Sequence, residues 1–128
     1  MNLTFYSVDS NDEKVVYTTS YKEIDSSTIE FIDKSVENTV INVKKLSTSS
    51  LLFTRCGKVT MILNLDLNKS TKGYYKNDLG LEFEFSVKTK KIEFINNKYY
   101  VEYETNINDI ISTHKISILL HKKDLQNT

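Results

Sequence analysis

Few side chains in this sequence combine a reactive type with a spacing that supports catalysis. Cys56 is the only cysteine, and it lies beside Arg55 and near Lys58, cations of the kind that can activate a thiol. No histidine is close to Cys56 in the sequence, and an isolated cysteine commonly behaves as a small, inert apolar side chain. We therefore predict no catalytic residue, and the sequence favours a binding protein over an enzyme.

The two histidines are candidates for metal binding, but their spacing argues against a shared site. His114 and His121 are seven residues apart on one predicted strand, and an odd separation places them on opposite faces. No Cys, Asp or His cluster with the spacing of a zinc site accompanies them. His114 shares a face with Ile116 and Ile118, so we expect a half-buried, hydrogen-bonded imidazole. We predict no metal and no other cofactor.

Arg55 is the strongest candidate for a polar contact to a ligand. It is the only arginine among 17 basic residues, and Cys56-Gly57, the dipeptide that follows it, is typical of a hairpin corner. Its guanidinium could instead cap carbonyl groups or pair with a carboxylate, and the sequence leaves these alternatives open. Tyr75, Tyr103 and His114 are weaker candidates for contacts to the same ligand.

The remaining charged residues indicate a solvated surface. Five glutamates alternate with the apolar residues of their strands and therefore share a face with nearby lysines: Glu82, Glu84, Glu93, Glu102 and Glu104. We interpret them as an exposed ladder of Lys–Glu pairs, each contributing less than ~1 kcal/mol, and not as catalytic acids. Because 17 basic residues are balanced by 17 acidic ones, and arginine is nearly absent, no nucleic-acid partner is expected.

The elements that would position these residues are strands, because apolar residues recur at every second position. Residues 59–67, 81–87 and 114–120 alternate in this way, so one face of each segment is buried and the other is wet. This predicts an all-β fold, an antiparallel meander that closes into a barrel of about eight to ten strands within a single domain, residues 1–128. We expect strands near residues 2–8, 13–22, 27–33, 38–46, 50–55, 58–67, 73–76, 80–95, 98–106 and 112–122.

One hairpin can be predicted residue by residue. Asn96-Asn97 tolerates the positive φ angles of a two-residue type I′ turn. Apolar side chains then meet on one face, and an opposite-charge pair forms on the other. The predicted pairs are Phe94 with Tyr99, Ile92 with Val101, Lys91 with Glu102 and Glu93 with Tyr100.

Two local irregularities are also expected. Apolar residues occupy odd positions up to Val87 and even positions from Ile92, which predicts a β-bulge between Lys88 and Lys91. The one candidate for helical structure is Asn106–Ile111, a short turn at most.

Cysteine usage and hydropathy indicate the compartment. A single cysteine allows no internal disulfide, which favours a reducing environment and a cytoplasmic protein. No segment has the basic and apolar pattern of a signal peptide, and none approaches the roughly 20 apolar residues of a membrane helix. No membrane association is expected.

Four segments follow one another in an order that is typical of a known family: Leu52–Met61, Gly73-Tyr74-Tyr75, Leu79-Gly80-Leu81 and Ser86–Lys90. Over roughly residues 17–121 the chain resembles the YwiB-like family of small bacterial proteins of unknown function. The resemblance implies a calycin-like, or lipocalin-like, β-barrel and no activity or catalytic residue. The chain lacks the Gly-x-Trp of lipocalins and the Arg-x-Tyr pair of fatty-acid-binding proteins, since Cys56 and Gly57 follow Arg55.

Two functions remain open for such a barrel. The first is a binding module for a small, partly apolar ligand, contacted by Arg55, Tyr75, Tyr103 and His114. The second is an interaction or self-association module, such as a homodimer, that docks through an outer face or an edge. In that case large inward residues such as Phe83 and Phe85 would fill the barrel. A cavity of about a few hundred Å³ favours the first function, whereas a filled interior with an outer apolar patch favours the second.

Overall fold

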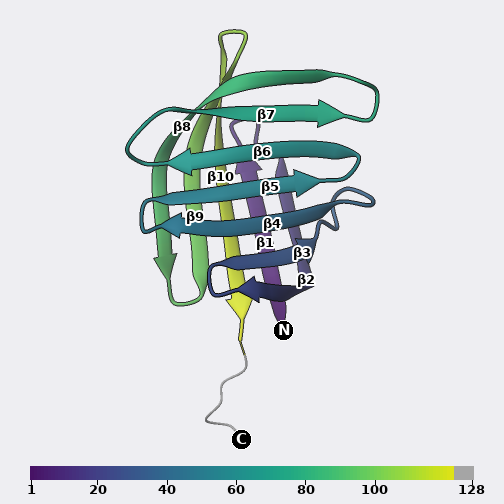
Figure 1. Cartoon of the computed structure of the whole chain (residues 1–128), viewed down its shortest axis with the longest axis vertical. Helices are drawn as coiled ribbons and strands as arrows, with labels where there is room; N and C mark the ends of the chain where they lie inside the picture. The colour runs from purple at the N-terminus through teal and green to yellow at the C-terminus, as the bar shows by residue number, and fades with distance from the viewer. Residues whose placement is uncertain (123–128) are drawn as a thin grey trace, which may run out of the picture.

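The computed structural model describes residues 1–122 as a closed ring of antiparallel strands (Figure 1). The strands are β1 (Asn2–Asp9), β2 (Lys14–Asp25), β3 (Thr28–Ile32), β4 (Val40–Ser47), β5 (Ser50–Cys56), β6 (Val59–Asp66), β7 (Thr71–Asn77), β8 (Glu82–Ile95), β9 (Lys98–Ile107) and β10 (Ile110–His121). Each strand pairs with its sequence neighbours, and β1 also pairs with β10. The predicted meander barrel is therefore confirmed, with each expected strand in place.

Two long strands serve as corners of the barrel. Residues 14–20 of β2 pair with β1, and residues 21–25 pair with β3. In β8, residues 82–87 pair with β7 and residues 86–95 pair with β9. In Figure 1, β4–β7 run across the direction of β1, β9 and β10, and β8 bends from one wall into the other. Splitting a long strand between two walls in this way encloses an interior.

The predicted hairpin and bulge are confirmed. Asn96 and Asn97 have φ angles of 51° and 65°, and β8 and β9 pair in the predicted register on both faces. The register shifts between Thr89 and Lys91, inside the predicted bulge. The helical candidate Asn106–Ile111 is instead a second hairpin, in which the turn residues Asn108 and Asp109 have φ angles of 52° and 67°. Short polar side chains tolerate these angles, which explains why the chain reverses there without a helix.

The inner face follows the predicted alternation, except where strands end. Leu63 and Leu65 are fully buried, whereas Leu67 is 38% exposed because β6 ends at Asp66. Leu81, predicted to point inward, is 55% exposed because β8 begins only at Glu82. Alternation therefore places a side chain inside the barrel only where strand pairing continues.

The two ends of the barrel differ. At the end formed by the β2–β3, β4–β5, β6–β7 and β8–β9 turns, aliphatic side chains fill the interior. The void among Val43, Leu51 and Val101 measures only about 10 Å³. At the opposite end, the β1–β2, β3–β4, β5–β6, β7–β8 and β9–β10 connections surround a larger space, described below. Within the described residues, no helix has the length and apolarity that crossing a bilayer requires.

Candidate ligand-binding site

A cavity of about 240 Å³ lies inside the barrel at this second end. Its wall is mostly apolar and aromatic, because the inward positions of eight strands, β1, β2 and β5–β10, project into it. The side chains that form this wall include Phe5, Phe53, Met61, Leu63, Phe83 and Phe85. Eight strands leave an interior just wide enough for side chains or one small ligand, so ten strands with large inward residues can still enclose usable volume.

All four residues predicted from the sequence to contact a ligand line this cavity. Arg55 lies at the end of β5, Tyr75 in β7, Tyr103 in β9 and His114 in β10. The barrel thus brings together side chains that are up to 59 residues apart in the sequence. The cavity also contains polar groups that the sequence interpretation missed, Ser7 and Thr105 among them.

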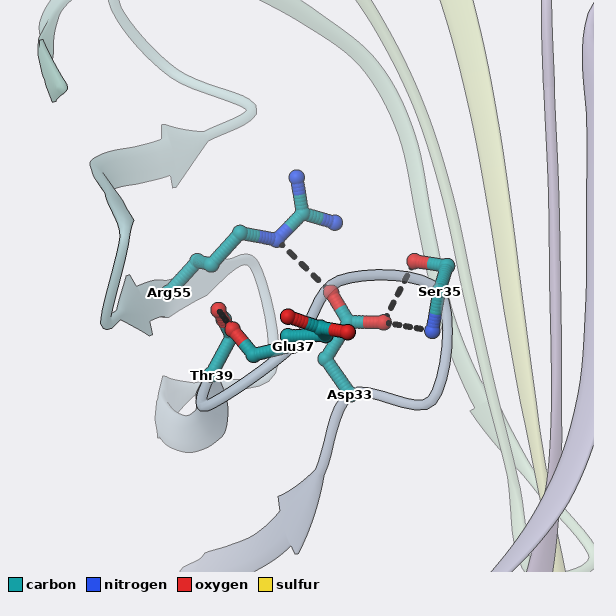
Figure 2. A network of polar contacts seen from close by, with 5 residues as sticks. All are labelled: Asp33, Ser35, Glu37, Thr39 and Arg55. Atoms are coloured by element: carbon teal, nitrogen blue, oxygen red, sulfur yellow. Dashed lines mark hydrogen bonds and ion pairs between the residues drawn. The ribbon is translucent and has the colours of Figure 1, made fainter. Parts of the chain in front are cut away.

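Arg55 forms an ion pair with Asp33, which follows β3. Its Nε lies 3.0 Å from Asp33 Oδ2, and the Asp33 side chain is fully buried while that of Arg55 is 21% exposed. The contact does not have the direction of a hydrogen bond. Figure 2 shows that the contact runs from Nε, and no dashed line joins either terminal nitrogen of Arg55 to the carboxylate. Pairing with a carboxylate, one of the alternatives left open for Arg55, is therefore confirmed, and the same side chain also lines the cavity.

The loop between β3 and β4, residues 33–39, is shaped by local hydrogen bonds. Asp33 Oδ1 accepts hydrogen bonds from both the backbone N–H and the hydroxyl of Ser35 (Figure 2). The backbone N–H of Asp33 donates to Thr39 O at 2.9 Å, and the Thr39 hydroxyl donates to Glu37 O at 3.0 Å. An aspartate that binds the backbone two residues ahead is a turn-forming device. It leaves Asp33 Oδ2 directed at Arg55.

Gly57, in the β5–β6 turn, allows this loop to approach the barrel. A Cβ atom added at Gly57 would lie 2.3 Å from Asn38 O and 2.7 Å from the Cα of Thr39. Only glycine fits at such a separation from backbone. The Cys56-Gly57 corner predicted from the sequence thus also determines where Asp33 lies.

Tyr17, in β2, belongs to the same buried polar group. Its hydroxyl is buried close to the Asp33 carboxylate, without the geometry of a well-directed hydrogen bond. Burial raises the pKa of Tyr17 far above its usual value, the charge of Asp33 raises it further, and Arg55 opposes the shift. The Tyr17 ring stacks on Phe5 with centroids 5.1 Å apart. Tyr17 is therefore a neutral phenol that shares the interior with the ion pair.

Tyr103 and His114 form a stacked pair on neighbouring strands. Their ring centroids are 4.9 Å apart, with 17° between the planes, and His114 Nε2 lies 3.0 Å from the hydroxyl oxygen of Thr105. Burial raises the pKa of Tyr103 well above its usual value, and Arg55 opposes that shift. Burial also lowers the pKa of His114, although Asp9 across the strand pair opposes the change. The expected half-buried, hydrogen-bonded histidine is confirmed.

Tyr75 completes the set from the other wall. It stacks on Phe83 with centroids 5.0 Å apart, and Phe83 in turn contacts Phe85. The ring of Phe85 lies over Gly73, where an added Cβ would come within 2.4 Å of it. The Phe85 ring therefore occupies the space that a side chain at residue 73 would need, and this ring forms part of the cavity wall.

The wall of the cavity combines mostly apolar side chains with a few polar and charged ones. Arg55 and Tyr103 present N–H and O–H groups to a mostly apolar space, Asp9 and Glu13 add two carboxylates to its wall, and Cys56 does not line it. Three glutamates of the predicted ladder contact lysines on the outer face: Glu104 with Lys90 at 3.4 Å, Glu93 with Lys91 at 2.9 Å and Glu102 with Lys115 at 4.0 Å. Among residues 1–122, no three His, Cys, Asp or Glu side chains gather as metal ligands would.

Asp33 and Tyr17, which lie beside Arg55, are two further polar residues that the sequence interpretation missed. Asp33-Lys34-Ser35 does carry a turn signal, but Asp25-Ser26-Ser27 carries the same one and lies exposed at the other end of the barrel. The signal therefore indicates a turn and does not indicate burial. Tyr17 could have been found by its alternation with Val15 and Thr19, which also point inward.

Comparisons with known proteins agree with this architecture. The sequence matches the family described as a domain of unknown function, DUF1934, over residues 4–120. The barrel is similar to the crystal structure of the ywiB protein from Bacillus subtilis, with a TM-score of 0.64 and 20% sequence identity over 94% of this chain and 91% of that chain. At this identity the likeness shows a shared fold. No curated protein matches the chain.

Proposed function

The chain belongs to the DUF1934 family, as its sequence resemblance to the YwiB-like proteins implied, and from this premise we propose that it is a non-enzymatic binding module. Its ligand is a small, partly apolar molecule held inside the barrel. The observation that carries the proposal is the cavity of about 240 Å³, whose apolar wall contains a few convergent polar groups. Such a combination is typical of small-molecule sites.

The size of the cavity limits the ligand. An engineered cavity of about 150 Å³ in another protein binds benzene, so this one suits a molecule of roughly ten to twelve non-hydrogen atoms. A long-chain lipid would not fit inside. As part of the same proposal, the protein works in the cytoplasm, where the exposed thiol of Cys56 stays reduced.

Indole is a suitable probe for this proposal. The protein contains no tryptophan, so the fluorescence of added indole can be followed without interference. We expect its emission to shift to shorter wavelength on binding, with a dissociation constant of roughly 0.1–1 mM for a ligand of this size.

A matched pair of variants tests whether indole enters the barrel. Ser7 lines the cavity, whereas Ser117 faces outward on the neighbouring strand β10. Ser7→Leu should fill the space and weaken binding at least tenfold, and Ser117→Leu should leave binding unchanged. Equal loss in both variants, or no binding by the wild type, would contradict the proposal.

Native mass spectrometry of protein purified from its own host addresses the natural ligand. We expect monomers that carry a small molecule, and Ser7→Leu should abolish this added mass. A ligand-free dimer would favour the alternative function, a self-association module such as a homodimer.

A further inference from the structure

The charges around the cavity are the starting point for identifying the class of ligand. Arg55 projects from an inward position of β5 into the cavity, and it is already paired with the buried carboxylate of Asp33. The other charged residues of the wall are Asp9, Glu13 and Lys115, two carboxylates and one ammonium. His114 adds no positive charge at neutral pH, because burial lowers its pKa. The site as a whole is therefore not electropositive.

An anionic ligand would meet a cost in this setting. Its charge would be buried beside a guanidinium whose own charge Asp33 has already neutralised, so the interior would hold one uncompensated negative charge. Burying such a charge is expensive unless it has its own partner. An uncharged ligand avoids this cost.

The guanidinium of Arg55 and the hydroxyl of Tyr103 are two hydrogen-bond donors in the wall of the cavity. The ion pair with Asp33 engages Nε of Arg55 (Figure 2), which leaves the terminal nitrogens available to a ligand. Tyr103 lines the same cavity and lies close enough to Arg55 for the guanidinium to lower its pKa against the effect of burial. A hydrogen bond from a charged donor is stronger than one between neutral groups. A carbonyl oxygen on the ligand would satisfy these donors.

We propose that the cavity selects uncharged molecules that join a compact apolar body, such as one aromatic ring, to a carbonyl-type acceptor held by the Arg55 guanidinium. This inference rests on the proposed binding function and narrows it to one chemical class. The Arg55–Asp33 ion pair then acts as a neutral donor, in which Asp33 excludes anions by cancelling the charge of Arg55.

Three probes of nearly equal size and shape test this selectivity. Benzylacetone carries a neutral carbonyl group, hydrocinnamate replaces its methyl ketone with a carboxylate, and isopentylbenzene replaces it with a branched alkyl group. Dissociation constants for the wild type can be measured by NMR titration at neutral pH. We expect benzylacetone to bind at least tenfold more tightly than hydrocinnamate, and more tightly than isopentylbenzene.

Variants assign the selectivity to the ion pair. Arg55→Met should remove the preference for benzylacetone over isopentylbenzene, whereas Lys58→Met should keep it, because Lys58 is exposed and outside the cavity. Asp33→Asn should raise the relative affinity for hydrocinnamate at least tenfold. Because Asp33→Asn could disturb its loop, the wild-type ranking of the probes remains the decisive measurement.

The outcomes separate this inference from the proposed function. If hydrocinnamate binds the wild type as tightly as benzylacetone does, the selectivity for uncharged ligands is wrong, and the binding function stands. If isopentylbenzene alone binds, the role of Arg55 as donor is wrong. If none of the three probes and no indole binds, both proposals fail.

Discussion

At the scale of single residues, the burial of His114 links the stability of the barrel to pH. Its pKa is lowered in the folded protein, so the unfolded chain takes up a proton more readily. The contribution of His114 to the free energy of unfolding is therefore full above the ordinary histidine pKa of 6.5. It is lost as the pH falls through this value, and the loss is complete below the lowered pKa of the folded protein. Each unit by which the pKa is lowered corresponds to about 1.4 kcal/mol.

Urea denaturation at about pH 7.5 and about pH 5.5 measures this dependence. We expect the wild type to lose stability between the two pH values, and His114→Gln to lose less, because glutamine does not titrate and can still bond the Thr105 hydroxyl. If His114→Gln loses as much stability between the two pH values as the wild type does, other groups determine the pH dependence.

The polar residues of the site differ in how well the sequence predicted them. Arg55 could be identified because it is the only arginine and lies next to a glycine corner. Its partner could not, because Asp33 reaches Arg55 across the end of the barrel, 22 residues earlier in the chain. A turn signal reports local hydrogen bonding, whereas the burial of Asp33 depends on how the whole loop is placed.

At the scale of elements, the position of the β3–β4 loop depends on Gly57 in the β5–β6 turn, which the loop contacts closely. Gly57→Ala should destabilise the protein by about 1–3 kcal/mol, because the added Cβ would collide with the backbone at Asn38 and Thr39, which cannot move aside as a flexible side chain would. The free energy of unfolding from urea denaturation measures this cost.

The neighbouring variant Cys56→Ala provides the control for Gly57→Ala. Cys56 is exposed, so its replacement should change stability by less than about 0.5 kcal/mol. If the cost at Gly57 arises from displacing the loop, Gly57→Ala should also weaken benzylacetone binding, since Asp33 would no longer hold Arg55. Equal stability of the two variants would contradict the close approach at Gly57.

Strands, turns and the bulge were predictable because each depends on local chemistry. The alternation of apolar residues predicts strands, the Asn96-Asn97 pair predicts a turn, and the shift of apolar phase before Ile92 predicts the bulge. Each of these signals lies within a few residues of the feature that it predicts. The irregular loop 33–39 was predicted only as a gap between strands. Its conformation depends on contacts with β5 and the β5–β6 turn, which no short segment of sequence contains.

At the scale of the whole molecule, the ring is closed by a pairing between the first and last strands. Phe5 in β1 lies opposite Ile118 in β10, a contact that spans most of the chain, whereas Ile92 and Val101 meet within one hairpin. Long-range pairing must overcome a larger loss of chain entropy before it forms. We therefore expect the seam between β1 and β10 to form late in folding.

Two matched substitutions test this order. Ile118→Val and Ile92→Val each remove one buried methyl group and should destabilise the protein by about 0.5–1.5 kcal/mol. In stopped-flow experiments Ile118→Val should mainly accelerate unfolding, and Ile92→Val should also slow folding. Slower folding in Ile118→Val than in Ile92→Val would reverse the proposed order.

The closed seam also restricts how this protein can associate with other chains. Each strand from β1 to β10 has two hydrogen-bonded neighbours, but β2 and β8 divide their length between them. Residues 88–95 of β8 pair with β9 alone, so the other edge of this segment carries no strand pairing within the described residues. Main-chain pairing with a foreign strand, the step by which open sheets template fibrils, is therefore confined to such corner segments, whereas at the seam it must first separate β1 from β10.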